Sequence, residues 1–347
     1  MGLKGKTGLI LSCYNYFMPV IYSLKSIHKL LKEQKPSKVC FVTSLKLFKK
    51  LNWAINEIGV KKSNIILIPD GEKAKEWHEL EKLLKKFSQM NLDRKSIVIA
   101  LGGGTVGDIV GFASSIYLRG IKYIQVPTTL LAQVDSAHGG KTGINFLKYK
   151  NQIGSFYLTI TTIIDTRFIS SLSKEQIIDG LGEIIKAGLV KDVSILNMLK
   201  KYNIGTLVKS KDLLKIINKS IKVKEYFVSK DFKDNNARQI LNFGHTIGHA
   251  IELKYKISHG RAVIIGMIKE LAFTESLGLT KPSVSKNLLN LLKSLGINID
   301  QNMKVDWKTI IRDKKIIGNQ IIFPIIKKEG EAKLISLELR AFKNIGC

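Results

Sequence analysis

The chain has 347 residues, 45% of them hydrophobic, and a formal net charge of +28 at pH 7. This size and composition suit about two globular domains with ordinary cores. A membrane-spanning helix is not expected, because no uninterrupted apolar run reaches about 18 residues. Tyr14 to Tyr16 end the first apolar run too early for a signal peptide. Cys13, Cys40 and Cys347 have neither metal-site nor disulfide spacing, so a reducing cytoplasm is the simplest location.

The large positive charge does not by itself predict nucleic-acid binding. Lysines such as Lys46, Lys49 and Lys61 are scattered along the whole chain, and no arginine-rich run or aromatic-interleaved basic motif occurs. We interpret the charge as a solvated, lysine-rich surface whose field can steer an anionic substrate. The alternative is a basic nucleic-acid-binding protein on a degenerate enzyme fold, which predicts steeply salt-dependent DNA binding.

The predicted elements change in kind near residue 170. Up to about Asp165, strands at 39–43, 64–68, 96–101, 123–126 and 162–165 alternate with helices such as 45–58 and 76–90. This alternation predicts a largely parallel sheet with helices on both faces. From Lys174 to about Leu295 the apolar spacing is helical, and only 320–326 and 333–339 resemble strands. We therefore predict an α/β domain over residues 1–170 and a mostly α-helical domain over 171–347.

A glycine cluster follows the apolar run Ser96 to Leu101. Its sequence, Gly102 to Asp108, predicts a strand turning into a helix whose free N–H groups can hold a phosphate. The G-x-G-x-x-G spacing is present, but no acidic residue ends the next strand, so a plain glycine-rich turn is the alternative. Further polar and cationic residues lie between glycines in 134–145 and 150–154, a composition typical of a binding site.

A second polar group lies in the helical half. Arg238, Asn242, His245 and His249 fall at helical spacing and are expected on one face of a helix. Burying such a stripe without a ligand would be costly. Three of the six histidines lie within 245–259, and with a nearby carboxylate they fit a catalytic zinc site. Spacing alone favours His245 and His249 as the ligand pair, although each histidine could instead have a surface or core-capping role.

Together these motifs resemble the 3-dehydroquinate synthase family in order and spacing over nearly the whole chain. They are Gly102 to Asp108, Tyr117-Leu118-Arg119-Gly120, Pro127 to Leu131, Val134-Asp135 through Gly140-Lys141, Lys150-Asn151, Gly182-Glu183 to Lys186, Asn242 to Thr246, and His259-Gly260. The resemblance implies a dehydroquinate synthase-like fold: a Rossmann-like NAD-binding domain, a mostly helical metal- and substrate-binding domain, and a site between them.

The resemblance also implies roles for individual residues. The zinc ligands, with cobalt as a possible substitute, would be Glu183, His245 and His259, and His249 would face the substrate instead. NAD would be bound by Ser44, Glu72, Lys75, Gly103, Gly104, Thr105, Asp108, Thr128, Thr129, Asp135, Lys141 and Lys150. The substrate would be bound by Arg119, Asp135, Lys141, Lys150, Asn151, Lys224, Arg238, Asn242, His249 and Lys315. Catalytic roles would fall to Lys141, Lys186, Lys224, Arg238, Asn242 and His249. Arg119 would cross a homodimer interface into the partner's site.

The implied reaction converts 3-deoxy-D-arabino-heptulosonate 7-phosphate to 3-dehydroquinate and phosphate, a step of the shikimate pathway toward chorismate and the aromatic amino acids. It combines transient oxidation by NAD, phosphate elimination, reduction and an intramolecular aldol closure. Several Lys and Arg residues suit a substrate with a carboxylate and a phosphate. The alternatives are a sister sugar phosphate cyclase of the inosose or valiolone type and a metal-dependent alcohol or glycerol dehydrogenase, which would release NADH. Neither nucleic acid nor membrane is an expected partner.

Four residues depart from the family pattern. Ser44 stands where an aspartate contacts the adenosine ribose, which predicts weaker NAD binding. His138 replaces an isoleucine, and we interpret it as a surface residue rather than one that perturbs Lys141. Gly182 replaces an alanine, which we expect to be a small change. Arg261 replaces a glutamate next to a metal ligand, and we expect it to alter how neighbouring groups support that ligand.

Overall fold

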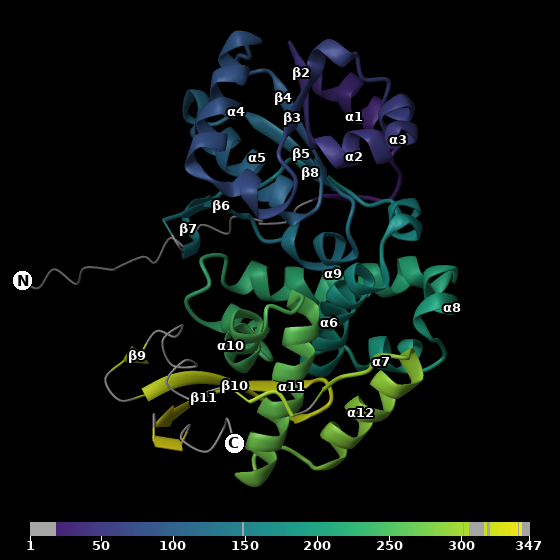
Figure 1. Cartoon of the computed structure of the whole chain (residues 1–347), viewed down its shortest axis with the longest axis vertical. Coiled ribbons are helices and arrows are strands. Elements are labelled where there is room, and N and C mark those ends of the chain that lie inside the picture. The colour runs from purple at the N-terminus through teal and green to yellow at the C-terminus, as the bar shows by residue number, and fades with distance from the viewer. Residues whose placement is uncertain are drawn as a thin grey trace, which may run out of the picture.

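The computed structural model describes residues 19–147, 149–300, 302–304, 316–317, 320–338 and 340–341. Lys315, Cys13 and Cys347 lie outside the described residues. Figure 1 shows an α/β part formed by the first half of the chain above a mainly helical part formed by the second half. None of the described helices is both long and apolar enough to cross a membrane.

The α/β part is built on a six-stranded sheet in the order β1-β8-β5-β4-β2-β3. The strands are β1 (Val20–Ile21), β2 (Val39–Ser44), β3 (Ile65–Ile68), β4 (Ile97–Gly102), β5 (Lys122–Pro127) and β8 (Thr161–Ile163), and every pairing is parallel. The helices are α1 (Ser26–Gln34), α2 (Leu45–Lys50), α3 (Asn52–Ile58), α4 (Trp77–Gln89) and α5 (Gly104–Ile116). The predicted α/β fold with a parallel sheet is therefore confirmed.

The sheet is covered on both faces because side chains alternate along each strand. In β4, Ile97 and Ile99 pack in one core with residues of α1 and α3. Val98 and Ala100 of the same strand pack in the other core with residues of α4 and α5. The predicted single helix over 45–58 is instead two helices, since the backbone leaves helical geometry at the buried Leu51.

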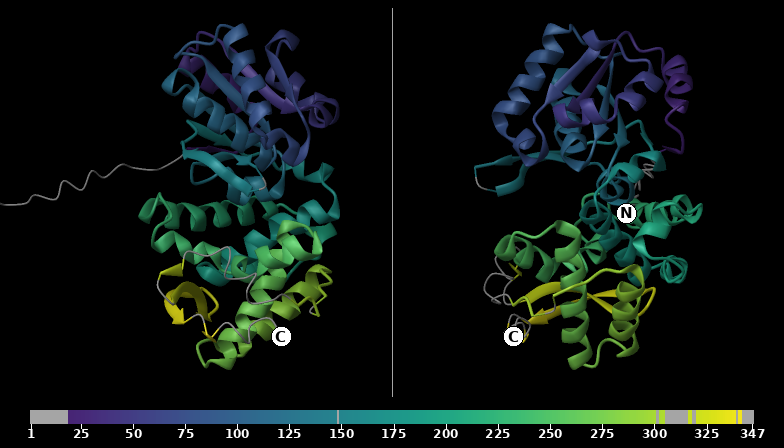
Figure 2. Two further views of the ribbon diagram at one scale, coloured as in Figure 1. Left: turned by 60° about the vertical axis from the view of Figure 1, so that its left-hand side comes forward. Right: turned by 45° about the vertical axis from the view of Figure 1, so that its right-hand side comes forward.

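A two-stranded antiparallel hairpin, β6 (Lys141–Phe146) and β7 (Tyr149–Phe156), extends from the α/β part. The sequence pattern predicted that its residues belong to a binding site, but it did not predict strands there. Figures 1 and 2 show the hairpin at the boundary between the α/β part and the helical part. Its lysines can therefore face the second half of the chain.

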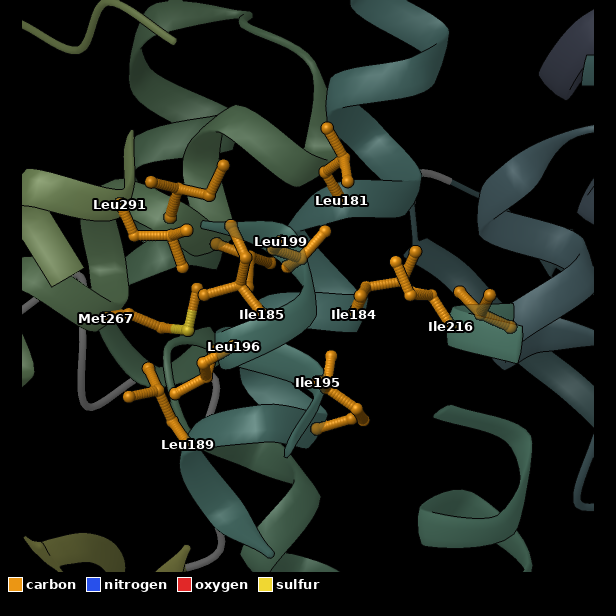
Figure 3. Packing of buried hydrophobic residues seen from close by; sticks show 14 of the residues in the cluster. Leu181, Ile184, Ile185, Leu189, Ile195, Leu196, Leu199, Ile216, Met267 and Leu291 are labelled. Atoms are coloured by element: carbon orange, nitrogen blue, oxygen red, sulfur yellow. The ribbon is translucent and has the colours of Figure 1, made fainter. Parts of the chain in front are cut away.

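The helical part is arranged around α6 (Lys174–Val190), which begins with a Ser173–Gln176 capping box. Leu181, Ile184 and Ile185 of α6 lie in the middle of a large apolar core (Figure 3). The other helices are α7 (Val193–Leu199), α8 (Ile204–Val208), α9 (Asp212–Lys230), α10 (His245–Tyr255), α11 (His259–Ser276) and α12 (Ser283–Leu295). A three-stranded antiparallel sheet, β9 (Ile316–Ile317), β10 (Gln320–Lys328) and β11 (Glu331–Glu338), completes it.

The helical stripe predicted over 238–249 is wrong in one respect. Arg238 and Asn242 belong to a short 3₁₀ helix, Ala237–Asn242, and α10 begins only at His245. Between them Gly244 has a φ of +80°, a left-handed conformation that favours glycine. An added Cβ at Gly244 would lie 2.5 Å from Met267 Cγ, so the close approach of α11 also requires glycine.

Helices α10 and α11 pack with their backbones in contact. A Cβ at Gly266 of α11 would overlap the carbonyl oxygen of Gly244 at the start of α10. The buried Glu270 of α11 accepts hydrogen bonds from the amides of Gly244 (2.8 Å) and Ile247 (3.1 Å), which satisfies N–H groups that a helix start leaves free. These contacts fix the beginning of α10 against α11.

We predict that Gly266→Ala destabilises the protein by about 1–3 kcal/mol, because its methyl group has no space beside Gly244. The matched control is Gly205→Ala in α8, where an added Cβ meets only Asn203 Oδ1 at 3.4 Å and stability should change by less than about 1 kcal/mol. Urea unfolding of both variants measures the difference. Equal stabilities for the two variants would contradict the backbone contact.

Candidate active site and metal centre

Three helices bring one carboxylate and two imidazoles together. Glu183 lies in the middle of α6, whereas His245 and His259 are the first residues of α10 and α11. The Nε2 atoms of His245 and His259 lie 3.4 Å and 3.6 Å from Glu183 Oε1. One potential ligand atom from each residue lies within 4.8 Å of the others. A carboxylate with two imidazoles is a donor set typical of a catalytic zinc site.

The charges around Glu183 favour a bound cation. The side chain is 3% exposed, and neither carboxylate oxygen accepts a hydrogen bond in the described chain, although the Lys186 ammonium forms an ion pair with it. Burial opposes ionisation, but Lys186 and His245 outweigh it and hold the pKa of Glu183 well below its usual range. Burial and Lys186 lower the pKa of His245 to about 3, so this imidazole is neutral and able to coordinate. The residues present therefore fit a divalent metal.

Glu252 of α10 supports His259 from the other side of the ring. Its Oε2 lies 3.0 Å from His259 Nδ1, which orients the ring so that Nε2 faces Glu183. Burial opposes protonation of His259, but Glu183 and Glu252 outweigh burial and raise its pKa to about 10. A metal ion would thus take the place of a proton held between two carboxylates. Sequence reasoning missed Glu252, although the helical spacing of His245 and His249 continues to it.

Two expectations about the metal ligands are wrong. Spacing alone favoured His245 with His249, but the ligand atoms that converge within 4.8 Å belong to Glu183, His245 and His259. Arg261 does not act on His259. It donates to both carboxylate oxygens of Glu175 (2.5 and 2.8 Å) and to the carbonyl of Asn298, and so ties the start of α11 to the start of α6.

Gly182 is also more than a small change from alanine. A Cβ at this position would lie 2.9 Å from the carbonyl oxygen of Gly260, closer than real side chains approach. Gly182 therefore lets α6 approach α11 more closely than an alanine would. Because Glu183 and His259 are the neighbours of these two glycines, the contact helps to set their separation.

Four of the predicted cationic anchors have partners within the chain. Lys141 of the hairpin pairs with Asp234, and Lys150 pairs with Glu252 at 2.9 Å. Lys224 of α9 pairs with Asp135 at 2.5 Å, and burial lowers the pKa of Lys224. Arg238 is buried and donates to the carbonyl oxygens of Gly139 (3.1 Å) and Phe232 (2.7 Å). Asn242 is partly buried in the 3₁₀ helix before α10.

The glycine cluster forms the turn from β4 into α5. Gly103 is the N-cap of α5, and a Cβ there would lie 3.1 Å from Thr129. A Cβ at Gly104 would lie 2.9 Å from Ser136 Oγ, and Thr105 follows in the first turn. The Thr128 hydroxyl is buried without a hydrogen-bond partner in the described chain. Free amides at the helix start, with space kept by glycines, fit the phosphates of a dinucleotide.

Further predicted cofactor residues lie beside this turn. Lys75 is buried and pairs with Asp108 at 2.7 Å, and it also donates to Asn151 of the hairpin. Glu72 accepts a hydrogen bond from Asn145 of the hairpin. Ser44 ends β2, the strand beside β4, and its hydroxyl accepts from Leu47 N at the start of α2. These residues therefore connect the turn to the hairpin and to the neighbouring strand.

One predicted substrate residue, Arg119, is not brought to the site. Arg119 is exposed in the turn beyond α5, at the opposite end of that helix from Gly104. Lys315 lies outside the described residues. The interpretation of His138 as a surface residue is wrong, since its side chain is 2% exposed and its ring lies 2.9 Å from the carbonyl oxygen of Gln133.

Comparison with known proteins agrees with this arrangement. Family models of the N-terminal and C-terminal parts of 3-dehydroquinate synthase match residues 65–179 and 180–316. The chain belongs to the 3-dehydroquinate synthase family. It is 42% identical over 285 residues to the 3-dehydroquinate synthase of Dictyoglomus thermophilum, covering 80% of each chain. The family predicted from the sequence is therefore confirmed.

Solved structures confirm the fold. A 2-deoxy-scyllo-inosose synthase, crystallised with carbaglucose-6-phosphate, NAD+ and Co2+, matches with a TM-score of 0.82 at 24% identity, over 95% of this chain and 96% of that one. The 2-epi-5-epi-valiolone synthase ValA of Streptomyces hygroscopicus subsp. jinggangensis 5008, with NAD+ and Zn2+ bound, matches with a TM-score of 0.80 at 22% identity, over 99% and 97% of the two chains. Both likenesses concern the fold alone.

We predict that Glu252→Gln weakens divalent metal binding by about 10–100-fold, because His259 loses a charged partner. Glu183→Gln should weaken it further, since it removes a ligand. Arg261→Gln is the matched control, because this residue is adjacent to the same ligands but pairs with Glu175. Competition with a chromophoric chelator measures all three affinities. An Arg261→Gln loss as large as that of Glu252→Gln would contradict the assignment.

Proposed function

We propose that this chain is a 3-dehydroquinate synthase. It converts 3-deoxy-D-arabino-heptulosonate 7-phosphate to 3-dehydroquinate and phosphate, as a carbon–oxygen lyase of the shikimate pathway that uses NAD and zinc or cobalt. The observation that carries the proposal is the buried Glu183–His245–His259 cluster with lysine–carboxylate pairs around it. Family membership supports the same reaction. The cytoplasm is the proposed location, consistent with the free thiol of Cys40.

The paired lysines suit a substrate with two anionic groups. Lys141, Lys150 and Lys224 are each held by a carboxylate of the chain, namely Asp234, Glu252 and Asp135. Lys224 is 14% exposed, and a cation withdrawn from water in this way needs a partner such as Asp135. Lys141 and Lys150 are 53% and 59% exposed, so their ion pairs serve to orient the ammonium groups beside these carboxylates. The substrate's carboxylate and phosphate exchange with them, so the ammonium groups are already oriented when binding occurs.

In this proposal the substrate binds between the metal ligands and the glycine turn. When bound, the metal acidifies the hydroxyl to be oxidised and NAD accepts and returns the hydride, so no net NADH is formed. Glu183, His245 and His259 hold the metal, and Lys186 compensates the buried carboxylate. Lys141, Lys224, Arg238, Asn242 and His249 orient the substrate and stabilise the charge that develops as phosphate leaves. The chain's contribution is therefore mainly orientation and electrostatics.

The NAD site is proposed at the turn between β4 and α5. The amides following Gly103 bind the phosphates, and Thr128 and Thr129 line the turn from the neighbouring strand end. Lys75, Asp108, Glu72 and Lys150 would contribute further contacts to NAD, since Lys75 and Glu72 bond to residues of the hairpin that carries Lys150. Ser44 faces the adenosine ribose with a hydroxyl in place of a carboxylate, which keeps our prediction of weaker NAD binding.

A homodimer is proposed to complete the site with Arg119. This residue is exposed beside Ile116 and Leu118, which are 44% and 42% exposed, and such apolar surface is typical of a protein interface. Its distance along α5 from the glycine turn prevents a role in its own subunit's site. A partner subunit can present it across the interface.

The first test measures phosphate release from 3-deoxy-D-arabino-heptulosonate 7-phosphate with NAD and zinc. We expect release that a chelator abolishes, formation of dehydroquinate and no accumulation of NADH. Glu183→Gln should be inactive and Arg261→Gln active. Metal-loaded protein that releases phosphate only from other sugar phosphates would identify a sister cyclase instead, and accumulating NADH would indicate a dehydrogenase.

The dimer proposal predicts complementation between two inactive variants. Coexpressed Arg119→Ala and Glu183→Gln subunits form hybrids in which one site has both native residues, so about a quarter of wild-type activity should return. Each variant alone should have almost none. The activity of the purified mixture is the measurement, and a mixture no more active than its components would show that Arg119 does not act across an interface.

A further inference from the structure

His138 closes an unusual turn of the backbone. Residues Ala132–Ser136 form a π-helix, a rare element that is frequent at functional sites. In a continued π-helix the carbonyl of Gln133 would accept from the amide of His138, but that amide donates to the carbonyl of Asp135 instead. The Gln133 carbonyl then takes its hydrogen bond from the ring of the same residue, His138, at 2.9 Å. The side chain therefore replaces a missing backbone donor.

The ring is neutral and its hydrogen is on Nε2. A carbonyl oxygen only accepts, so the ring nitrogen that contacts Gln133 must be the donor. Nδ1 is consequently unprotonated, and it is buried without a hydrogen-bond partner in the described chain. Burial lowers the pKa of His138 to about 4, so the ring adds no positive charge near Lys224 at neutral pH. An isoleucine at this position could fill the space but could not donate.

The turn that His138 closes is anchored at its other end. The Gln133 side chain is fully buried, and its Nε2 donates to the carbonyl oxygens of Pro127 (3.1 Å) and Asp165 (2.9 Å). These carbonyls belong to the end of β5 and to the residue shortly after β8. The backbone of Gln133 is thus held by the ring, and its side chain is held by the sheet.

Asp135 lies within the closed turn and makes one of the contacts that join the two halves of the chain. Its carboxylate pairs with Lys224 of α9 at 2.5 Å. On the other side of His138, the carbonyl of Gly139 accepts from Arg238 at 3.1 Å. His138 therefore stands between two residues whose contacts with the helical part depend on the path of this backbone.

We propose that His138 is a positioning residue that locks the π turn and thereby holds Asp135 against Lys224. Its Nε2–H group, rather than its volume, performs this role. The consequence for catalysis rests on the proposed function, because Asp135 and Lys224 are there substrate-binding residues. The effect of His138 on the backbone does not rest on the proposed function, because the ring holds the turn whether or not substrate is bound.

The test compares His138→Leu, which removes the donor, with His138→Gln, whose amide can place a donor near the position of Nε2. Hydrogen exchange of a peptide over residues 130–138 measures the turn, and steady-state kinetics measure the site. Ile164→Val is a control that changes a fully buried apolar side chain without altering a hydrogen bond. A peptide from α6 serves as the internal reference for global stability.

For His138→Leu we expect at least about tenfold faster exchange confined to the turn. We also expect kcat/KM to fall by about tenfold or more, mainly because KM increases. His138→Gln should stay near the wild type in both measurements. The proposal is overturned if His138→Leu leaves hydrogen exchange in the turn unchanged. It is also overturned if the effects of His138→Leu on exchange and kcat/KM are no larger than those of Ile164→Val, or if His138→Gln behaves like His138→Leu.

The two proposals fail in different ways. If the wild-type protein has no synthase activity, the proposed function is wrong, and the exchange data still decide whether His138 locks the turn. If the wild type is active and the exchange of the turn does not depend on the donor, the proposed function stands and the role of His138 is rejected.

Discussion

The Glu183 carboxylate lies in the buried middle of α6, and the helical half is arranged to make that burial possible. Residues 180–190 of α6 are all buried, so water has little access to the charge. The positive charge comes from Lys186 on the same helix and from His259 at the start of α11, with the neutral ring of His245 beside the same carboxylate. A buried carboxylate of this kind is stable only when positive charge reaches it, and a metal ion meets that need best.

The same requirement explains the glycines of the helical half. His245 and His259 can approach one carboxylate only if α10 and α11 lie closer than ordinary side chains permit. Gly244 and Gly266 provide this approach between α10 and α11, and Gly182 provides it between α6 and α11. Glu270 then fixes the start of α10 through its amides. Close packing of backbones and the geometry of the metal site are therefore one feature of the structure.

Charge pairs join the two halves of the chain at the site. Lysines of the hairpin pair with Asp234 and Glu252 of the helical half, whereas Asp135 of the α/β half pairs with Lys224 of α9. Each half thus supplies charges that the other compensates. Glu252 contacts both the hairpin Lys150 and the ligand His259, so the position of the hairpin and the orientation of a metal ligand depend on one carboxylate. The net charge of +28 makes the chain as a whole attractive to anions.

Local pattern by itself determined the alternating strands and helices, the glycine turn and the identity of the polar groups, because periodicity and glycine chemistry depend on neighbours in the chain. Tertiary structure alone decided which of those groups meet. Helical spacing favoured His249 as a ligand, but α11 brings His259 from a separate helix. His138 was predicted to be a surface residue because its sequence neighbours do not reveal a partner for its ring. That partner, the carbonyl oxygen of Gln133, lacks a backbone donor only once the π turn has formed. Arg261 finds its partner at Glu175, far away in the chain, because the starts of α6 and α11 lie side by side. Partners of this kind depend on long-range packing, which no local pattern encodes.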